Sequence, residues 1–302
     1  MNIVISSGHG AKVPGASGYI DEVTEARNVV EHVADYLLQL GCGVVTFDDD
    51  ISDTQSENLE TIVDFHNAQT RDLDVSVHFN AYCETDKPMG TEVLYVTAAD
   101  IASRVCNAIC KAGFVNRGAK YRSDLYFLNN TEKSAILIEV CFVDSKADTD
   151  LYAKRFDGIC RLIAIAISGK VLVPKSIPDN QRDIIASTFG GTDDYNVSAY
   201  DDGLVLDDTS FYVALPDRFE GERPDVRVFN NATGASAVAM ILDVGPWNID
   251  DPYFFMNTRP QAESGTDMQG RTTNGAGIDL SPALAKALGI DGMGKVDWDF
   301  IK

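Results

Sequence analysis

The apolar run Ala135–Phe142 constrains the fold of this chain more than any other segment, because its only charged residue is Glu139. Such a run is typical of a strand that is buried on both faces, as strands are in parallel sheets covered by helices. Strand-like and helix-like segments alternate around it through residues 1–170. This alternation predicts an α/β domain in which a mostly parallel central sheet is flanked by helices.

The elements expected in this first domain follow from the hydrophobic spacing and from glycines that end helices. Strands are expected at 3–6, 43–47, 74–79, 90–96 and 135–142, and helices at 23–40, 57–67, 98–112 and 151–167. Residues 171–184, which include Pro174 and Pro178, are expected to form a linker. Residues 185–302 are rich in Asp, Gly, Asn and Pro, and their short alternating segments predict a smaller, mostly-β domain.

The charge and the apolar content exclude some classes of partner. A formal net charge of −21 disfavours nucleic acid, because such a surface repels phosphate groups. No apolar stretch has the length of a membrane span. The six cysteines include no CxxC pair, and the start of the sequence lacks the pattern of a signal peptide. We therefore expect a protein made in the cytoplasm with reduced thiols, without a nucleic-acid partner or a membrane span.

Two of the four histidines lie where expected strands end: His9 follows the segment 3–6, and His78 ends the segment 74–79. Ligands bind at the carboxyl ends of strands in open α/β sheets, so both imidazoles are expected to point into one crevice. Glycines on both sides of His9, Gly8 and Gly10, would allow an unusual turn there. Either histidine alone would be an ordinary polar residue, but the pair, with the carboxylates below, predicts a metal site.

A third metal ligand is expected at the start of the first long helix, where Glu22 and Glu25 are both candidates. Two histidines and one carboxylate, with a position left for water, form a common catalytic zinc set. Acidic residues also favour helix N-termini without any metal, so the residues alone do not choose between these two glutamates. His32, in the middle of a helix, and His66, at a helix end where a cation is favoured, are expected to be structural.

Glu139 is expected to exchange protons during catalysis. A carboxylate inside so apolar a strand is unfavourable unless it is paired or functional. Burial raises the pKa of a carboxyl group, which suits a general acid/base near neutral pH. The competing interpretation is a glutamate at a strand end that faces solvent or pairs with an arginine.

Four segments, at 5–10, 15–18, 76–81 and 137–142, occur in an order and spacing that resemble the zinc-dependent N-acetylmuramoyl-L-alanine amidases of the type 3 family, which includes many phage endolysins. The resemblance covers residues 1–168. It implies one zinc ion bound by His9, Glu22 and His78, with Glu139 as the catalytic glutamate. Glu22 is preferred because its distance from Gly41, which ends the helix, matches the family. Asn80, two residues after the second histidine, is expected to orient substrate or its loop.

The second domain carries segments such as Asp243-Val244-Gly245-Pro246 and 277–281 that resemble the double-psi β-barrel domains of rare lipoprotein A and the expansins. This resemblance implies that Asp243 is an active or sugar-contacting acid and that the domain binds the cell wall. The alternatives are a second lytic enzyme that acts on glycan strands and a structural or partner-binding module. A histidine common in that group before Leu-Pro is replaced in the segment 212–216, which argues against glycan cleavage. Trp247 and Tyr253 are candidates for stacking on sugar rings.

Together the two resemblances imply an endolysin that hydrolyses the amide bond between N-acetylmuramic acid and L-alanine in bacterial peptidoglycan. It would be made in the host cytoplasm and would act on the wall after release. The alternatives are a bacterial autolysin or remodelling amidase, a bifunctional lysin whose second domain cleaves glycan strands, a zinc carboxypeptidase, and a non-catalytic wall-binding protein.

Overall fold

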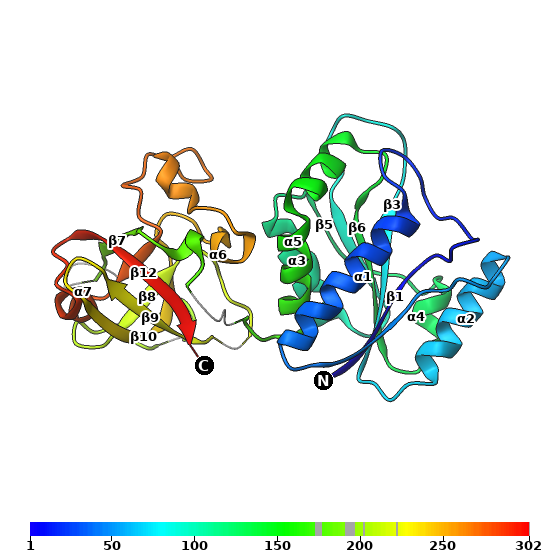
Figure 1. Ribbon diagram of the computed structural model, residues 1–302, viewed down its shortest axis with the longest axis horizontal. Coiled ribbons are helices and arrows are strands. Elements are labelled where there is room, and N and C mark those ends of the chain that lie inside the picture. The colour runs from blue at the N-terminus through cyan, green and yellow to red at the C-terminus, as the bar shows by residue number, and fades with distance from the viewer. Residues whose placement is uncertain (173–176, 191–196, 202, 222, 302) are drawn as a thin grey trace. The chain divides into compact units, whose positions relative to one another are not determined.

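A computed structural model describes the chain except for residues 173–176, 191–196, 202, 222 and 302 (Figure 1). The chain divides into two compact units, Met1–Lys170 and Val171–Lys302. Within the expected linker 171–184, residues 173–176 lie outside the described part, and a short 3-10 turn, Asp179–Gln181, precedes the first strand of the second unit.

The first unit is built on a six-stranded sheet with the order β2-β1-β3-β6-β4-β5. Its strands are β1 (Asn2–Ser7), β2 (Gly43–Phe47), β3 (Leu73–Asn80), β4 (Thr91–Tyr95), β5 (Asn116–Tyr121) and β6 (Ser134–Phe142). The four strands from β2 to β6 are parallel, and β4 and β5, parallel to each other, run against β6. The expected α/β class with a mostly parallel central sheet is therefore confirmed, and the apolar run at 135–142 lies in an interior strand.

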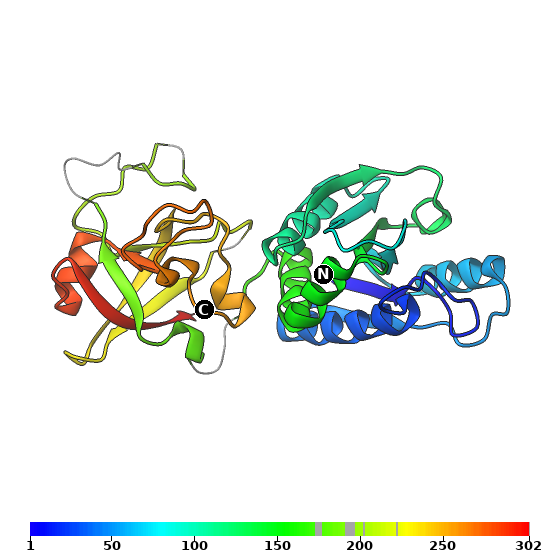
Figure 2. The ribbon, with the colours of Figure 1, turned by 90° about the horizontal axis from the view of Figure 1, so that it is seen from above.

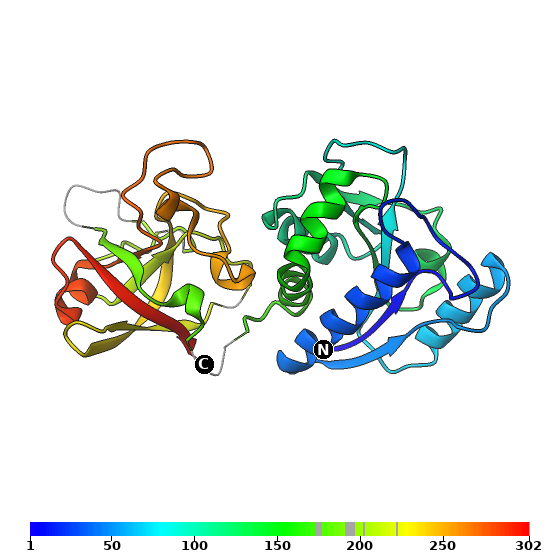
Figure 3. The same ribbon diagram turned by 45° about the horizontal axis from the view of Figure 1, so that its top comes forward.

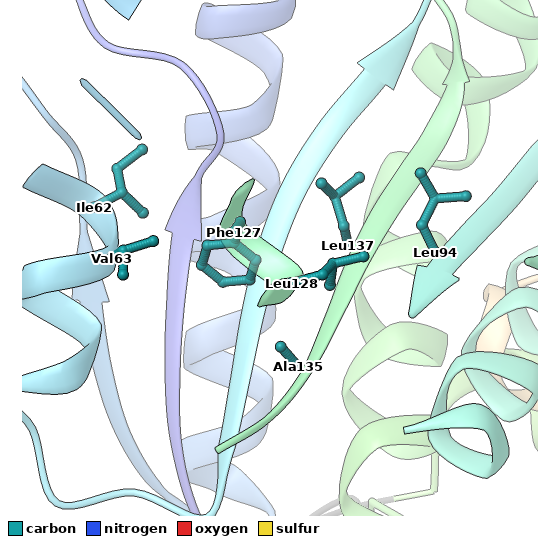
Figure 4. Packing of buried hydrophobic residues seen from close by; sticks show 7 residues of the cluster. All are labelled: Ile62, Val63, Leu94, Phe127, Leu128, Ala135 and Leu137. Carbon is teal, nitrogen blue, oxygen red and sulfur yellow. The ribbon is translucent and has the colours of Figure 1, made fainter. Parts of the chain in front are cut away.

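Helices cover both faces of this sheet (Figures 1 and 2). The helices are α1 (Glu22–Gln39), α2 (Gln55–Asn67), α3 (Ala99–Lys111), α4 (Tyr126–Asn130) and α5 (Lys146–Ser168). Helices α1, α3 and α5 pack together on one face. On the other face α2 and α4 bury an apolar cluster against β4 and β6 (Figure 4), formed by Ile62, Val63, Leu94, Phe127, Leu128, Ala135 and Leu137.

The register of the strands decides which residues share the face covered by α2 and α4. Leu137 of β6 lies opposite Ser76 of β3 and Leu94 of β4. Two residues further along the same strands, Glu139 lies opposite His78 and Glu92. Because side chains alternate between the faces of a sheet, this second row projects on the same face as the apolar cluster, nearer the carboxyl end of β6.

The second unit is a closed six-stranded barrel with the order β10-β8-β11-β7-β12-β9 (Figure 3). The strands are β7 (Ile184–Thr188), β8 (Tyr212–Leu215), β9 (Asp225–Asn230), β10 (Ala235–Val244), β11 (Ile278–Leu280) and β12 (Met293–Ile301), and the helices are α6 (Tyr253–Met256) and α7 (Pro282–Leu288). This confirms the smaller, mostly-β domain. No helix within the described ranges combines the length and apolar character needed to cross a bilayer.

Candidate metal centre

Three side chains from separate parts of the first unit converge at the carboxyl ends of β1 and β3. His9, Glu22 and His78 each present one donor atom, and these atoms all lie within 4.8 Å of one another. Glu22 Oε1 lies 3.0 Å from His78 Nδ1 and 3.6 Å from His9 Nε2. The structure thus brings together the two histidines and one of the two glutamates that the sequence offers.

Local structure fixes Glu22 as the glutamate at this centre. Asp21 caps α1 by accepting a hydrogen bond from the Thr24 backbone N–H, which makes Glu22 the first residue of the helix. The buried carboxylate then accepts backbone hydrogen bonds from Phe79 at 3.0 Å and Ala16 at 2.5 Å. Glu25 points elsewhere, because its carboxylate accepts a hydrogen bond from the Tyr152 hydroxyl at 2.8 Å.

Burial and mutual charge set the protonation of the three groups. Burial is the largest cause that lowers the pKa of His9, and the charge of His78 lowers it further. Burial also lowers the pKa of His78, but the hydrogen bond to Glu22 and the charges of Glu139 and Glu22 outweigh this and raise it overall. Burial raises the pKa of Glu22, yet the two histidines and the Ala16 amide leave it below its ordinary value. Glu22 is therefore ionised between two imidazoles, as a metal ligand must be.

Glycines near the centre serve close packing. A Cβ atom on Gly8 would lie 1.8 Å from His78 Nε2, and one on Gly15 would lie 2.3 Å from Glu22 Oε2. Neither Gly8 nor Gly10 has a positive φ, so a left-handed backbone is not the reason for glycine on either side of His9. The glycines are needed because the backbone passes directly against the ligand side chains.

The donor set fits a zinc ion. Tetrahedral zinc with bonds of about 2.0–2.1 Å places its ligand atoms about 3.3 Å apart. The distances of 3.0 Å and 3.6 Å from Glu22 Oε1 to the two imidazole nitrogens lie on either side of this value. The second ring nitrogen of His9, Nδ1, is buried without a hydrogen-bond partner in the described part of the chain.

Glu139 lies beside this centre, opposite His78 in the register of β6 and β3. Its Oε2 is buried and has no hydrogen-bond partner among the residues that the structure describes. Burial is the main cause that raises the pKa of this carboxyl group to about 7; Glu22 and Glu92 raise it further, while His78 and Arg122 oppose the shift. Arg122 is itself bonded to Asp124. The group is thus a carboxyl poised to take and give a proton near neutral pH.

The sequence did not single out Glu92, which lies opposite Glu139 on β4. Glu92 accepts hydrogen bonds from Arg117 and Lys120 of β5 at 2.7 Å and 2.6 Å. Asn80, expected to orient substrate or its loop, donates a hydrogen bond to Glu92 at 3.3 Å. The positive charges of Arg117 and Lys120 were the sequence signal for a buried acidic partner such as Glu92. The sequence did not predict β5, the strand that carries both residues.

His66 is structural, as expected, but not for the expected reason. Its ring is buried between Asp74 Oδ1 at 2.8 Å and Ser6 Oγ at 3.0 Å. Burial lowers the pKa of His66 despite the opposing effect of Asp74, so the residue is not a cation at an exposed helix end. Arg71 binds the same carboxylate through Nε at 2.8 Å. This network ties α2 to β1 and β3, the strands that lead to His9 and His78.

The second unit holds a different group of acids. Asp279 of β11 accepts a hydrogen bond from the Ser187 hydroxyl, and burial raises its pKa to about 6, with a further contribution from the charge of Asp243. Burial also raises the pKa of Asp243. Trp247 is partly exposed, whereas Tyr253 is fully buried and its hydroxyl donates to the Gly277 carbonyl. The expectation that Tyr253 could stack on sugar is therefore wrong.

Comparisons with known proteins divide the chain in the same way. The model of the N-acetylmuramoyl-L-alanine amidase family matches residues 3–168 of the 302. A family described as a domain of unknown function (DUF8814) matches residues 195–299. An uncharacterized protein of Clostridium perfringens (strain 13 / Type A) is 31% identical over 233 residues, which cover 74% of this chain and 68% of that protein.

Two further proteins are similar over a shorter length. An uncharacterized 38.4 kDa protein of Clostridium perfringens is 34% identical over 178 residues, 57% of this chain, so the match spans about half of that relative (52%). A solved structure described as the catalytic domain of the CD27L endolysin targeting Clostridia difficile is 29% identical. It superposes with a TM-score of 0.52, covering 57% of this chain and 98% of that domain.

Proposed function

The chain belongs to the N-acetylmuramoyl-L-alanine amidase family and is a peptidoglycan amidase, and from this premise we propose that it works with one zinc ion. His9, Glu22 and His78 would hold the ion, and Glu139 would be the general acid/base. The observation that carries this proposal is the convergence of three donor atoms within 4.8 Å beside a carboxyl group whose Oε2 has no partner in the described residues.

When bound, zinc lowers the pKa of water and polarises the scissile carbonyl. Residues of the chain transfer the protons and hold the charges of the site. Glu139, with a pKa raised to about 7, accepts the proton of the attacking water on its carboxylate and later donates it to the leaving amine of L-alanine. Glu22 stays ionised because the two histidines and the amides of Phe79 and Ala16 stabilise its charge.

The biological setting and the second unit are parts of the same proposal. We propose a lysin that is made in the host cytoplasm and reaches the wall after release; the alternative is an autolysin or remodelling amidase. The similarity to an endolysin catalytic domain supports the first setting. For the barrel we infer a wall-binding role of the double-psi type, in which Asp243 contacts glycan. Testing Asp243→Asn for glycan cleavage and for binding to purified walls separates this role from that of a second lytic enzyme.

Digestion of purified sacculi tests the reaction. An amidase releases intact stem peptides that begin with L-alanine, whereas a carboxypeptidase releases terminal D-amino acids and a wall-binding protein releases neither. Mass analysis of the soluble fraction tells these outcomes apart, and either of the last two contradicts the proposal.

A matched pair of variants tests the metal. Glu22→Ala removes an anchored ligand, and Glu25→Ala removes a neighbouring carboxylate that bonds to Tyr152. We expect about one zinc per chain in the wild type and in Glu25→Ala, and a loss of both zinc and activity in Glu22→Ala. Equal zinc content in the two variants would show that the ion is held elsewhere.

A further inference from the structure

A row of polar side chains crosses the sheet from the metal centre to its edge. His78 of β3 lies opposite Glu139 of β6, which lies opposite Glu92 of β4. Beyond Glu92, Lys120 of β5 lies opposite Leu94 and reaches Glu92 with its ammonium group, 2.6 Å from Oε2. Since neighbouring strands are about 4.8 Å apart, the backbone of β5 lies roughly 10 Å from that of β6.

The end of this row is positive although the chain as a whole is strongly negative. Glu92 contributes one negative charge, and Arg117 and Lys120 contribute two positive charges, so the three side chains together carry one excess positive charge. The formal net charge of the whole chain is −21. A local cationic group on the face that carries Glu139 would attract an anionic part of a bound substrate.

The two cations differ in how much of their bonding capacity the protein uses. Arg117 is held on several sides: Nε donates to Glu92, Nη1 donates to the Met89 carbonyl at 3.4 Å, and the guanidinium lies 4.9 Å from the centre of the Phe142 ring. Lys120 donates to Glu92, and its side chain is 41% exposed. An ammonium group has three N–H donors, and within the described residues Lys120 uses one of them for Glu92. The other donors can bind a ligand.

The substrate offers a matching anion. In a peptidoglycan stem peptide the residue after L-alanine is a D-glutamate linked through its side chain, so its α-carboxylate is free unless it is amidated. Two residues of extended peptide span about 7 Å, and a lysine side chain adds several ångströms of reach. A stem peptide whose scissile amide lies at Glu139 and runs across β4 would therefore bring this carboxylate to Lys120.

We propose that Lys120, backed by Glu92 and the fixed Arg117, forms a subsite that binds the free α-carboxylate of the second stem-peptide residue. The inference rests on the proposed amidase reaction. It makes Lys120 a specificity residue on the leaving-group side of the bond, and it predicts discrimination against stem peptides that carry D-isoglutamine in place of D-isoglutamate.

Two synthetic substrates test the subsite: N-acetylmuramoyl tetrapeptides that differ only in D-isoglutamate or D-isoglutamine at the second position. We expect the wild type to cleave the carboxylate form with a kcat/KM roughly tenfold higher, as for a partly exposed charged hydrogen bond. Lys120→Met should remove this preference by raising KM for the carboxylate form, and Lys120→Arg should keep it. Lys133→Met, at the amino end of β6, is the matched control and should behave as the wild type.

The outcomes separate the subsite from the reaction on which it rests. Equal cleavage of both substrates by the wild type overturns the subsite and leaves the amidase proposal intact. An equal loss on both substrates in Lys120→Met also overturns it, because Lys120 would then act only by neutralising Glu92. Cleavage of neither substrate by a zinc-loaded wild type overturns the proposed function itself.

Discussion

Each of the two units contains a buried carboxyl group with a raised pKa, but the surroundings of the two groups differ. Burial raises the pKa of Glu139 to about 7 and that of Asp279 to about 6. Glu139 lies opposite His78 in the sheet, and its Oε2 has no hydrogen-bond partner in the described part of the chain, whereas Asp279 accepts a hydrogen bond from Ser187. All four histidines of the chain lie in its first 78 residues. A raised pKa alone therefore does not distinguish the two carboxyl groups; the histidines near Glu139 do.

Replacing Glu139 with Gln is expected to have the largest effect. The change removes the proposed general acid/base but keeps the size of the side chain, so kcat for amide cleavage should fall by about 10²- to 10⁴-fold. Zinc content should stay unchanged, because the three proposed ligands remain. The matched change in the barrel, Asp279→Asn, should leave amidase activity unchanged. High activity in zinc-loaded Glu139→Gln would remove the distinction between the two carboxyl groups.

The same barrel variant should change stability in a pH-dependent way. The pKa of Asp279 is raised from 3.8 to about 6 in the folded state, so its contribution to stability is present below pH 4 and is lost as the pH rises through 6. Asp279→Asn should therefore raise the free energy of unfolding at pH 7.5 by up to about 3 kcal/mol and should have little effect at pH 3.5. Denaturant unfolding of the barrel at the two pH values measures this difference.

Asp207→Asn is the control of opposite sign. Hydrogen bonds from Thr209 and Ser210 lower the pKa of the exposed Asp207 to about 2. Its charge stabilises the fold at neutral pH, and that contribution is lost as the pH falls towards 2, so Asn should lower stability at pH 7.5. If Asp279→Asn lowers stability at pH 7.5 as Asp207→Asn does, the assignment of Asp279 as a destabilising buried charge is wrong.

The space around the functional side chains also differs between the two units. A Cβ atom on Gly8 would overlap the His78 ring at 1.8 Å, whereas one on Gly245 would lie 3.9 Å from Asp279 Oδ2. We expect Gly8→Ala to weaken zinc binding by about 10- to 100-fold, because displaced ligands lose affinity on this scale. Titration against a chelator measures the affinity. Gly43→Ala, whose Cβ meets the movable Asn2 side chain, should bind zinc as the wild type does.

The sequence predicted what depends on local pattern. The apolar run around Glu139 predicted an interior strand, and two strand-end histidines predicted a shared crevice. It could not separate Glu22 from Glu25 by physical reasoning, because both lie in the first turn of α1 and the choice depends on distant partners. Those partners are the Ala16 amide for Glu22 and the Tyr152 hydroxyl for Glu25.

The missed features have tertiary causes. Strand β5 has the sequence Asn-Arg-Gly-Ala-Lys-Tyr, which lacks an apolar alternation. It lies at the edge of the sheet, and its pairing with β4 is a tertiary contact that the local sequence does not indicate. The hydrophobic pattern therefore did not place Lys120, the subsite residue, on a strand. His66 was assigned to a helix end, but its partner Asp74 lies on a strand, and helical position alone carries no information on such a contact.

The smallest effect is expected for replacing Trp247. This change tests whether the barrel binds the cell wall while the first unit hydrolyses it. Trp247 is 37% exposed, and its Nε1 donates to Asn274 at 2.7 Å, which holds the ring in one orientation. In the inactive Glu139→Gln background, Trp247→Ala should weaken binding to purified sacculi about five- to tenfold, the scale of one aromatic contact. Met293→Ala, an exposed apolar residue on β12, should bind as the parent does. If Trp247→Ala and its parent bind sacculi equally well, Trp247 does not contribute to wall binding, and the proposed glycan contact of Asp243 loses this support.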